Sequence, residues 1–318
     1  MPKRQPSQVL KRILSAAVIV LVALALFGTT LSRILIDYWW FGELHQRDTW
    51  GTLWAARLVP AGLAMLVVAA ILVAQILIAR RFDTRSYDAR SPEDVAVARL
   101  AEAVGSRSKW AWTAGVVFIS GVAGLQVGQN WEQWLLFRNS TSFGVKDPQF
   151  GKDVGFYIFE LPWWRFIADW AFGVIVITII VTVLAHYLWG GLRVQPPFQR
   201  MSTAVKIHVS VLLAIAAGVK AVQYWLDQYG LMNSDRGVVR GASATDIAAS
   251  LPGLQLMVVV AAISAVLFLI NIRRGGVALP VLATILIIGV RLIVGVAYPL
   301  GYQQLKVSPN ELSAERTY

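Results

Sequence analysis

Hydrophobic positions along the chain fall into seven long runs that are separated by polar segments. The runs lie at residues 13–36, 53–78, 110–127, 166–188, 205–225, 254–272 and 277–297. Each is long enough, at about 1.5 Å per residue in a helix, to cross a hydrocarbon core roughly 30 Å thick. The pattern predicts an all-α, polytopic transmembrane helix bundle of about seven spans over residues 1–303.

Basic residues concentrate in alternate polar segments. They precede the first run, fill residues 80–109, and recur between the fourth and fifth runs and between the sixth and seventh; examples are Lys3, Arg4, Lys11, Arg12, Arg80, Arg81, Arg193, Arg200, Lys206, Arg273 and Arg274. With seven spans all four groups fall on one side of the bilayer. By the positive-inside rule, the N-terminus is then cytoplasmic and the C-terminus extracytoplasmic. We expect a multi-pass membrane protein.

Composition agrees with a bilayer as solvent. Of the 318 residues 57% are hydrophobic and only 15% are charged, whereas soluble domains are about 25% charged. The net charge of +11 comes largely from the short basic segments, so we predict lipid contacts and no nucleic-acid partner. The chain has no cysteine, which excludes disulfides, thiolate catalysis, Cys-ligated zinc and iron–sulfur clusters.

The predicted outer loops are rich in aromatic residues, whose amphipathic rings suit the headgroup layer. In the second of these loops, Phe156–Trp164 is expected to lie along the interface or to form a short strand-like lid. The same loop contains three carboxylates, Asp147, Asp153 and Glu160. Because the EF-hand spacing is absent, they are interpreted as solvated or turn-capping groups. Calcium binding is the alternative.

Two stretches carry a family resemblance. They are SFGVKDPQFGKDVGFYIFELPW, which ends at Trp163, and YQQLKVSPNELSAERTY, which ends at Tyr318. Together with the seven runs, they resemble the UPF0182 family of uncharacterised bacterial membrane proteins, found largely in actinobacteria and cyanobacteria. The resemblance implies a seven-span region followed by a large extracytoplasmic domain, so residues 304–318 are expected to begin a linker to such a domain. It implies no catalytic residue and no activity.

Four charged residues interrupt the predicted spans: Arg57, Asp169, Lys220 and Arg291. Their positions along the spans place all four in the outer half of the bilayer, where an unpaired charge costs several kcal/mol. One hypothesis is a basic pocket for an anionic ligand such as a lipid headgroup, because Asp169 can neutralise only one of three cations. In the alternative, Arg57 and Asp169 reach the interface, and Lys220 and Arg291 meet Asp227, Asp37 or backbone carbonyls.

Other chemistry has weaker sequence support. His186 and His208 lie near the inner ends of adjacent spans, where a pair could ligate haem b. No second pair accompanies them, and interfacial histidine is common, so we expect no cofactor. Motifs for zinc proteases, phosphate-binding loops and nucleophile elbows are absent. We therefore predict no metal site and no catalytic residue.

Gly124 and Gly128 form a G-x-x-x-G pattern in the third run, with Gly121 nearby. It favours a close helix contact, either within the bundle or in a dimer. Two function classes remain open. The first is a non-enzymatic cell-envelope scaffold that positions an extracytoplasmic domain and binds a protein partner or a second copy. The other is a transporter or lipid-handling protein with the four charges lining an outward-facing pocket.

Overall fold

The computed structural model describes residues 8–82, 95, 99, 108–189, 191–193, 200–235, 241–274 and 276–315. The chain divides into two compact units, residues 1–59 and 60–318. In the first unit, helix α1 (Gln8–Glu43) is followed by a short turn and the beginning of α2 (Arg47–Arg81). Tyr38 and Trp50 pack edge to face across that turn, with ring centroids 5.1 Å apart.

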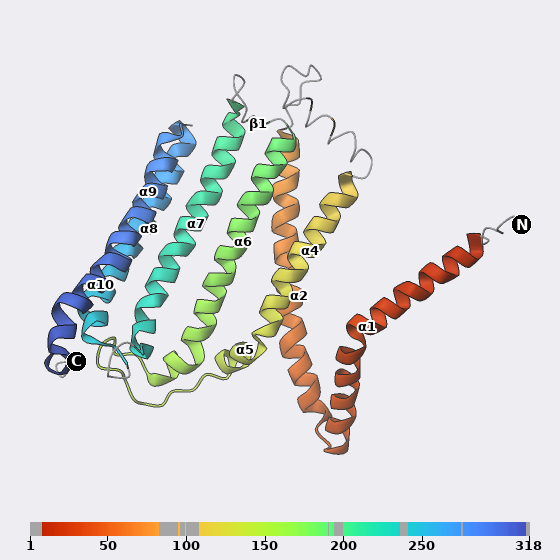
Figure 1. Ribbon diagram of the computed structural model, residues 1–318, viewed down its shortest axis with the longest axis horizontal. Helices are drawn as coiled ribbons and strands as arrows, with labels where there is room; N and C mark the ends of the chain where they lie inside the picture. Colours follow the sequence, from red (N-terminus) through yellow and green to blue (C-terminus); the bar gives the residue numbers. More distant parts are fainter. Residues whose placement is uncertain are drawn as a thin grey trace, which may run out of the picture. The chain divides into compact units, whose positions relative to one another are not determined.

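The second unit is a set of long helices lying side by side (Figure 1). Its long helices are the remainder of α2, α4 (Ser108–Gln129), α6 (Leu161–Leu188), α7 (Thr203–Gly230), α8 (Leu251–Arg274) and α9 (Ala278–Leu292). Three of them are extended by a π-helical segment, namely η2 (Phe156–Glu160) before α6, η4 (Asp246–Ser250) before α8 and η5 (Ile293–Ala297) after α9.

Short elements connect or end these helices. They are α5 (Trp131–Arg138), the antiparallel pair β1 (Leu192–Arg193) and β2 (Arg200–Met201), η3 (Leu231–Asn233), α10 (Tyr298–Tyr302), η6 (Gln303–Val307), η7 (Ser308–Asn310) and α11 (Glu311–Glu315). The capping of α7 explains one boundary, because the Ser202 hydroxyl accepts a hydrogen bond from the backbone N–H of Val205.

Small and branched side chains set the packing order of the bundle. Val68 and Leu72 of α2 meet Ala123 of α4 and Val174 of α6. At the other side, α7, α8 and α9 meet in a cluster formed by Ala214, Ala217, Phe268 and Ala283. Such small residues allow close approach of helix backbones in a membrane bundle.

Gly124 allows one such close approach. A methyl group there would lie 2.7 Å from the carbonyl oxygen of Ala61 and 3.0 Å from the Cβ of Met65, both on α2. The helix contact predicted from the G-x-x-x-G pattern is therefore made inside the bundle at Gly124. No such crowding surrounds Gly121, where a methyl group would meet nothing within 4 Å.

The first six predicted hydrophobic runs each lie within one α-helix, and the seventh covers α9 and its continuation η5. Among the described residues, six helices are long and apolar enough to cross a membrane: Arg47–Arg81, Lys109–Gln129, Phe156–Leu188, Thr203–Asn233, Asp246–Arg274 and Ala278–Asn310. Helix α1, which contains the first predicted run, adds the shorter apolar stretch Ile13–Val22. The count of seven spans and their orientation stay predictions.

One segment differs in form from what the sequence suggested. The strand-like lid is wrong for Phe156–Trp164, because this segment consists of η2 and the first turn of α6. Residues 304–315 are helical, and Val307 is only 1% exposed. The Thr245 hydroxyl hydrogen-bonds the side chain of Gln303 and ties this end of the chain to the segment before α8. The role of residues 304–318 as a linker stays a prediction.

Candidate functional site

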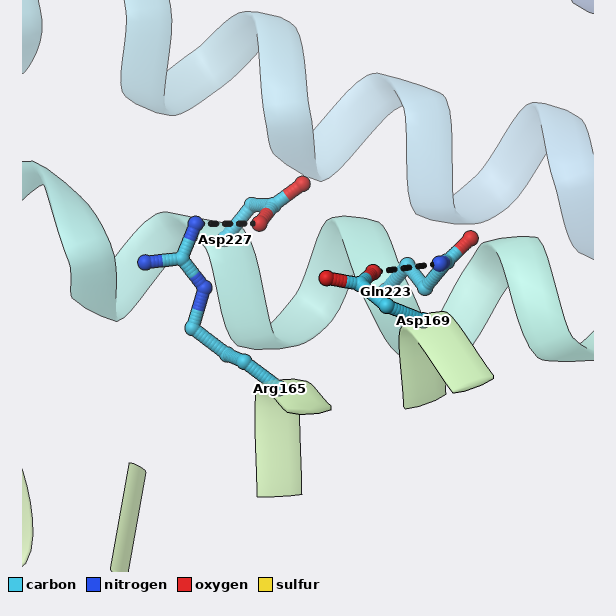
Figure 2. A network of polar contacts seen from close by, with 4 residues as sticks. All are labelled: Arg165, Asp169, Gln223 and Asp227. Atoms are coloured by element: carbon cyan, nitrogen blue, oxygen red, sulfur yellow. Dashed lines mark hydrogen bonds and ion pairs between the residues drawn. The ribbon is translucent and has the colours of Figure 1, made fainter. Parts of the chain in front are cut away.

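Polar side chains pair in two successive steps along the seam between α6 and α7 (Figure 2). The Arg165 guanidinium donates to the Asp227 carboxylate at 3.0 Å, with both side chains partly exposed. One helical turn further along, the amide of Gln223 donates to Asp169 at 2.6 Å. The two helices run antiparallel, so residues four apart on α6 meet residues four apart on α7.

The next turn of this seam replaces the carboxylate by an aromatic ring. The Lys220 ammonium lies 4.4 Å from the ring centroid of Phe172 on α6 and 5.6 Å from that of Tyr224. These are cation–π distances, and such contacts stabilise a cation more strongly when it is removed from water. Lys220 is half-buried, and no carboxylate lies within ion-pair distance of it in the described part of the chain.

Arg291 approaches the same aromatic residue from α9. Its guanidinium carbon lies 5.7 Å from the Tyr224 centroid. Gly295 makes room for this side chain, because a methyl group there would lie 2.5 Å from an Arg291 guanidinium nitrogen. Arg291 likewise has no ion-paired carboxylate among the described residues. Lys220 and Arg291 are thus two cations gathered around one ring.

These two cations line a cavity of about 360 Å³, which we call the basic groove. Besides Lys220, Arg291 and Thr284, its lining is apolar or aromatic, including Phe172, Leu213, Tyr224, Phe268, Ile288 and Leu292. A mostly apolar cavity with a few placed polar groups is the usual form of a small-molecule site. The arrangement can hold an anionic group at the cations and a hydrocarbon part along the rest of the lining.

The predicted set of four charges divides between different places. Lys220 and Arg291 share the basic groove, whereas Asp169 lines a separate cavity and bonds Gln223. Arg57 belongs to the other unit, where its guanidinium lies 5.6 Å from the Trp54 ring; its grouping with the others stays a prediction. The alternative partner Asp227 pairs with Arg165 instead of Lys220 or Arg291. Sequence reasoning missed Phe172 and Tyr224, the two aromatic residues of the site. Their spacing was a usable signal, because Phe172 lies three residues after Asp169 and Tyr224 lies four residues after Lys220.

The histidine pair is brought together, but as a hydrogen-bonded chain. His186 Nε2 and His208 Nδ1 lie 3.1 Å apart with the rings perpendicular, and His208 Nε2 bonds the Gln75 side-chain oxygen. A bis-histidine haem would need its iron and porphyrin between the two coordinating nitrogens. The direct bond occupies that space, so the geometry gives the haem hypothesis no support. The pair instead links α6 and α7 to α2.

The carboxylates Asp147 and Asp153, in the loop between α5 and η2, accept hydrogen bonds from the backbone of that loop. Asp153 accepts hydrogen bonds from the Ser142 hydroxyl and from the backbone N–H groups of Phe143, Gly144 and Gly155, at 2.7–3.0 Å. These bonds hold the pKa of Asp153 at about 2. Burial raises the pKa of Asp147, but four hydrogen bonds outweigh it and leave that pKa below its usual value. Both carboxylates therefore shape the loop, and the described residues contain no cluster of three or more metal-ligating side chains.

Comparisons with known proteins agree with the resemblance seen in the sequence. A family model described as "Uncharacterised protein family (UPF0182)" matches residues 14–318. A UPF0182 protein of Frankia alni is 39% identical over 228 residues, which cover 72% of this chain and 22% of the relative. A UPF0182 protein of Mycobacterium tuberculosis is 35% identical over 309 residues, covering 96% of this chain and 32% of the relative. The chain thus spans about a third or less of the length of these relatives, and no solved structure matches it.

Proposed function

The chain belongs to the uncharacterised protein family UPF0182, and we propose that it binds the anionic headgroup of a membrane lipid in the basic groove. The observation that carries this proposal is the meeting of Lys220 and Arg291 at one ring. Each lies within 6 Å of the Tyr224 centroid, and neither has an ion-paired carboxylate among the described residues.

Electrostatics favours an anionic ligand at this place. A lysine or arginine at the centre of a membrane helix costs about 2.5–3.5 kcal/mol on insertion scales. Two such cations near one ring also repel each other, and the cation–π contacts offset only part of the cost. The phosphodiester of a lipid headgroup between them, with its single negative charge, would offset one of the two positive charges and accept charge-assisted hydrogen bonds from both side chains.

The rest of the groove suits the hydrocarbon part of a lipid. Its lining beyond Lys220, Arg291 and Thr284 is apolar or aromatic. Only 6% of the apolar window of Ala278–Asn310 is buried, against 39% for Asp246–Arg274. This chain therefore leaves most of the helix that carries Arg291 uncovered, which in a bilayer would give a lipid a direct route into the groove.

Lipid titration of the purified chain in nanodiscs tests this proposal. Phosphatidylglycerol is the anionic probe and phosphatidylcholine the neutral reference, with bound lipid counted by native mass spectrometry. Lys220→Gln and Arg291→Gln should each weaken phosphatidylglycerol binding about fivefold, from about 1 kcal/mol per basic residue. Arg138→Gln, at an exposed arginine outside the groove, is the matched control and should have no effect. Equal binding of both lipids, or equal effects of the three variants, would contradict the proposal.

The membrane arrangement belongs to the same proposal. Seven spans with a cytoplasmic N-terminus would place the groove in the outer half of a bacterial plasma membrane. The basic residues of alternate loops support this orientation. A lipid bound there would come from the outer leaflet.

A scaffold role is the second candidate. It is favoured by the length of the relatives, since the matched region covers only 22–32% of them. In that case this region would position further domains and associate with a protein partner or a second copy in the membrane. Gentle extraction of the native protein, followed by mass measurement of the complex, tests the role. A particle with the mass of one chain plus detergent and lipid would argue against it.

A further inference from the structure

A second cavity, which Asp169 helps to line, differs in character from the basic groove, because its lining is polar and balanced in charge. The cavity has a volume of about 340 Å³, and we call it the polar pocket. Its hydrogen-bonding residues are Asn130, Gln133, Tyr157, Arg165, Asp169 and Asn233. They come from α5 and its N-cap residue, from the continuous helix η2–α6 and from η3, so three separate segments converge on one space.

The polar pocket retains hydrogen-bonding capacity. The side-chain oxygen of Gln133 is buried and has no hydrogen-bond partner among the described residues. Asp169 accepts from Gln223 through one carboxylate oxygen, and its other oxygen points away from that bond (Figure 2). Arg165 uses one guanidinium nitrogen for Asp227. A buried acceptor without a partner destabilises the folded chain, so a ligand that donates a hydrogen bond to Gln133 would remove this penalty.

The lining chemistry selects among ligands. One guanidinium and one carboxylate line the pocket, so the charges balance and neither a simple anion nor a simple cation is favoured. Carboxamides both donate and accept hydrogen bonds, and so does a hydroxyl group. Phe166 and Tyr157 also line the space and offer ring surface to an apolar C–H face. This combination of mixed donors and acceptors beside aromatic rings fits a neutral ring that bears several hydroxyl groups.

We propose that the polar pocket is a binding site for a sugar ring. The proposal is independent of lipid binding in the basic groove, because Lys220 and Arg291 do not line this pocket. The same chemistry would recognise a free sugar or the sugar headgroup of a glycolipid. Position allows both, since the pocket lies beside the α4–α5 junction and the start of α6, in the segment predicted to face the outer membrane surface.

Two binding arms distinguish these sources. In the first, free glucose, galactose and mannose are titrated into the purified chain in nanodiscs. Binding is followed by intrinsic fluorescence, because Phe166 packs on Trp163 with centroids 5.6 Å apart. In the second, native mass spectrometry compares diglucosyl-diacylglycerol with phosphatidylethanolamine in the same nanodiscs. Binding of a hexose or of the glycolipid supports the proposal and identifies the source.

Matched variants assign the binding to the pocket. Gln133→Leu and Asn233→Leu should each weaken sugar or glycolipid binding roughly tenfold through the loss of hydrogen bonds. Glu132→Leu is the control, since Glu132 is the exposed neighbour on α5 and does not line the pocket. Circular dichroism checks helix content, and either pocket variant alone suffices if the other does not fold. The proposal is overturned if no hexose or glycolipid binds, if phosphatidylethanolamine is preferred, or if the control weakens binding equally.

Discussion

Replacing His208 by leucine should destabilise the bundle more than replacing either Gln75 or His186, the two residues to which the His208 side chain is hydrogen-bonded. His208 is the middle member, and both of its ring nitrogens are engaged, one with His186 and one with Gln75. The substitution therefore removes two side-chain hydrogen bonds, which join α7 to α6 and to α2. Gln75→Leu and His186→Leu each remove only one.

The expected loss of stability is measured against the unfolded chain in the membrane. Side-chain hydrogen bonds between membrane helices contribute about 0.6 kcal/mol on average and about 1.7 at most, because the unfolded chain in the membrane also finds partners. Losing two bonds should then cost about 1–3 kcal/mol, and losing one should cost about half as much. The larger values expected for a buried unsatisfied group in a soluble protein do not apply to that reference state.

The assay is reversible unfolding in mixed micelles by increasing the fraction of sodium dodecyl sulfate, with helix content followed by circular dichroism. His45→Asn is the control, because His45 is exposed in the turn between α1 and α2 and should leave the midpoint unchanged. The reasoning is refuted if His208→Leu is no more destabilising than Gln75→Leu. It is also refuted if the double change His186→Leu with His208→Leu costs the sum of the two single changes, since the pair shares one bond.

Three further predictions concern packing, acid stability and topology. Gly124→Val should loosen the contact between α4 and α2, because even a methyl group there would lie 2.7 Å from a backbone oxygen; a lowered unfolding midpoint, absent in Gly121→Val, is the readout. Folding lowers the pKa of Asp153 from 3.8 to about 2, so its stabilisation of the loop between α5 and η2 is complete above about pH 4 and is lost as the pH falls toward 2. Limited proteolysis of the loop across that window should show increasing cleavage, and Asp153→Asn should weaken the pH dependence and leave the part that is due to Asp147, whose pKa is also lowered. Since the chain has no cysteine, Asn139→Cys and Gly276→Cys each give a single labelling site. An impermeant maleimide should reach Asn139→Cys from outside the cell and Gly276→Cys only from inside. The reverse result would disprove the predicted orientation.

The helices could be placed from the sequence because the signal for each is local. A run of apolar residues long enough to cross a bilayer specifies a helix without reference to any other segment. The same locality explains the error at the start of α6. For Phe156–Trp164 we expected a segment along the interface or a strand-like lid, because its composition suits both, and the structure continues it into α6 as a helix.

The candidate site was only partly predictable. The sequence identified Lys220 and Arg291 as charges that the bilayer alone does not explain, and both line one groove. It grouped Asp169 with them from depth alone. Depth gives the height of a residue along a helix but not the direction of its side chain, and Asp169 bonds Gln223 and lines the polar pocket instead.

The sequence by itself determined where the chain is helical, which residues are charged within the apolar runs, and which chemistries its composition excludes. Only the tertiary structure decided which side chains contact one another. Arg165 takes Asp227, Lys220 and Arg291 meet around Tyr224, and His208 bonds both His186 and Gln75. The physical reason is that hydropathy depends on residues adjacent in sequence, whereas these contacts depend on the rotation and register of helices that are distant in sequence.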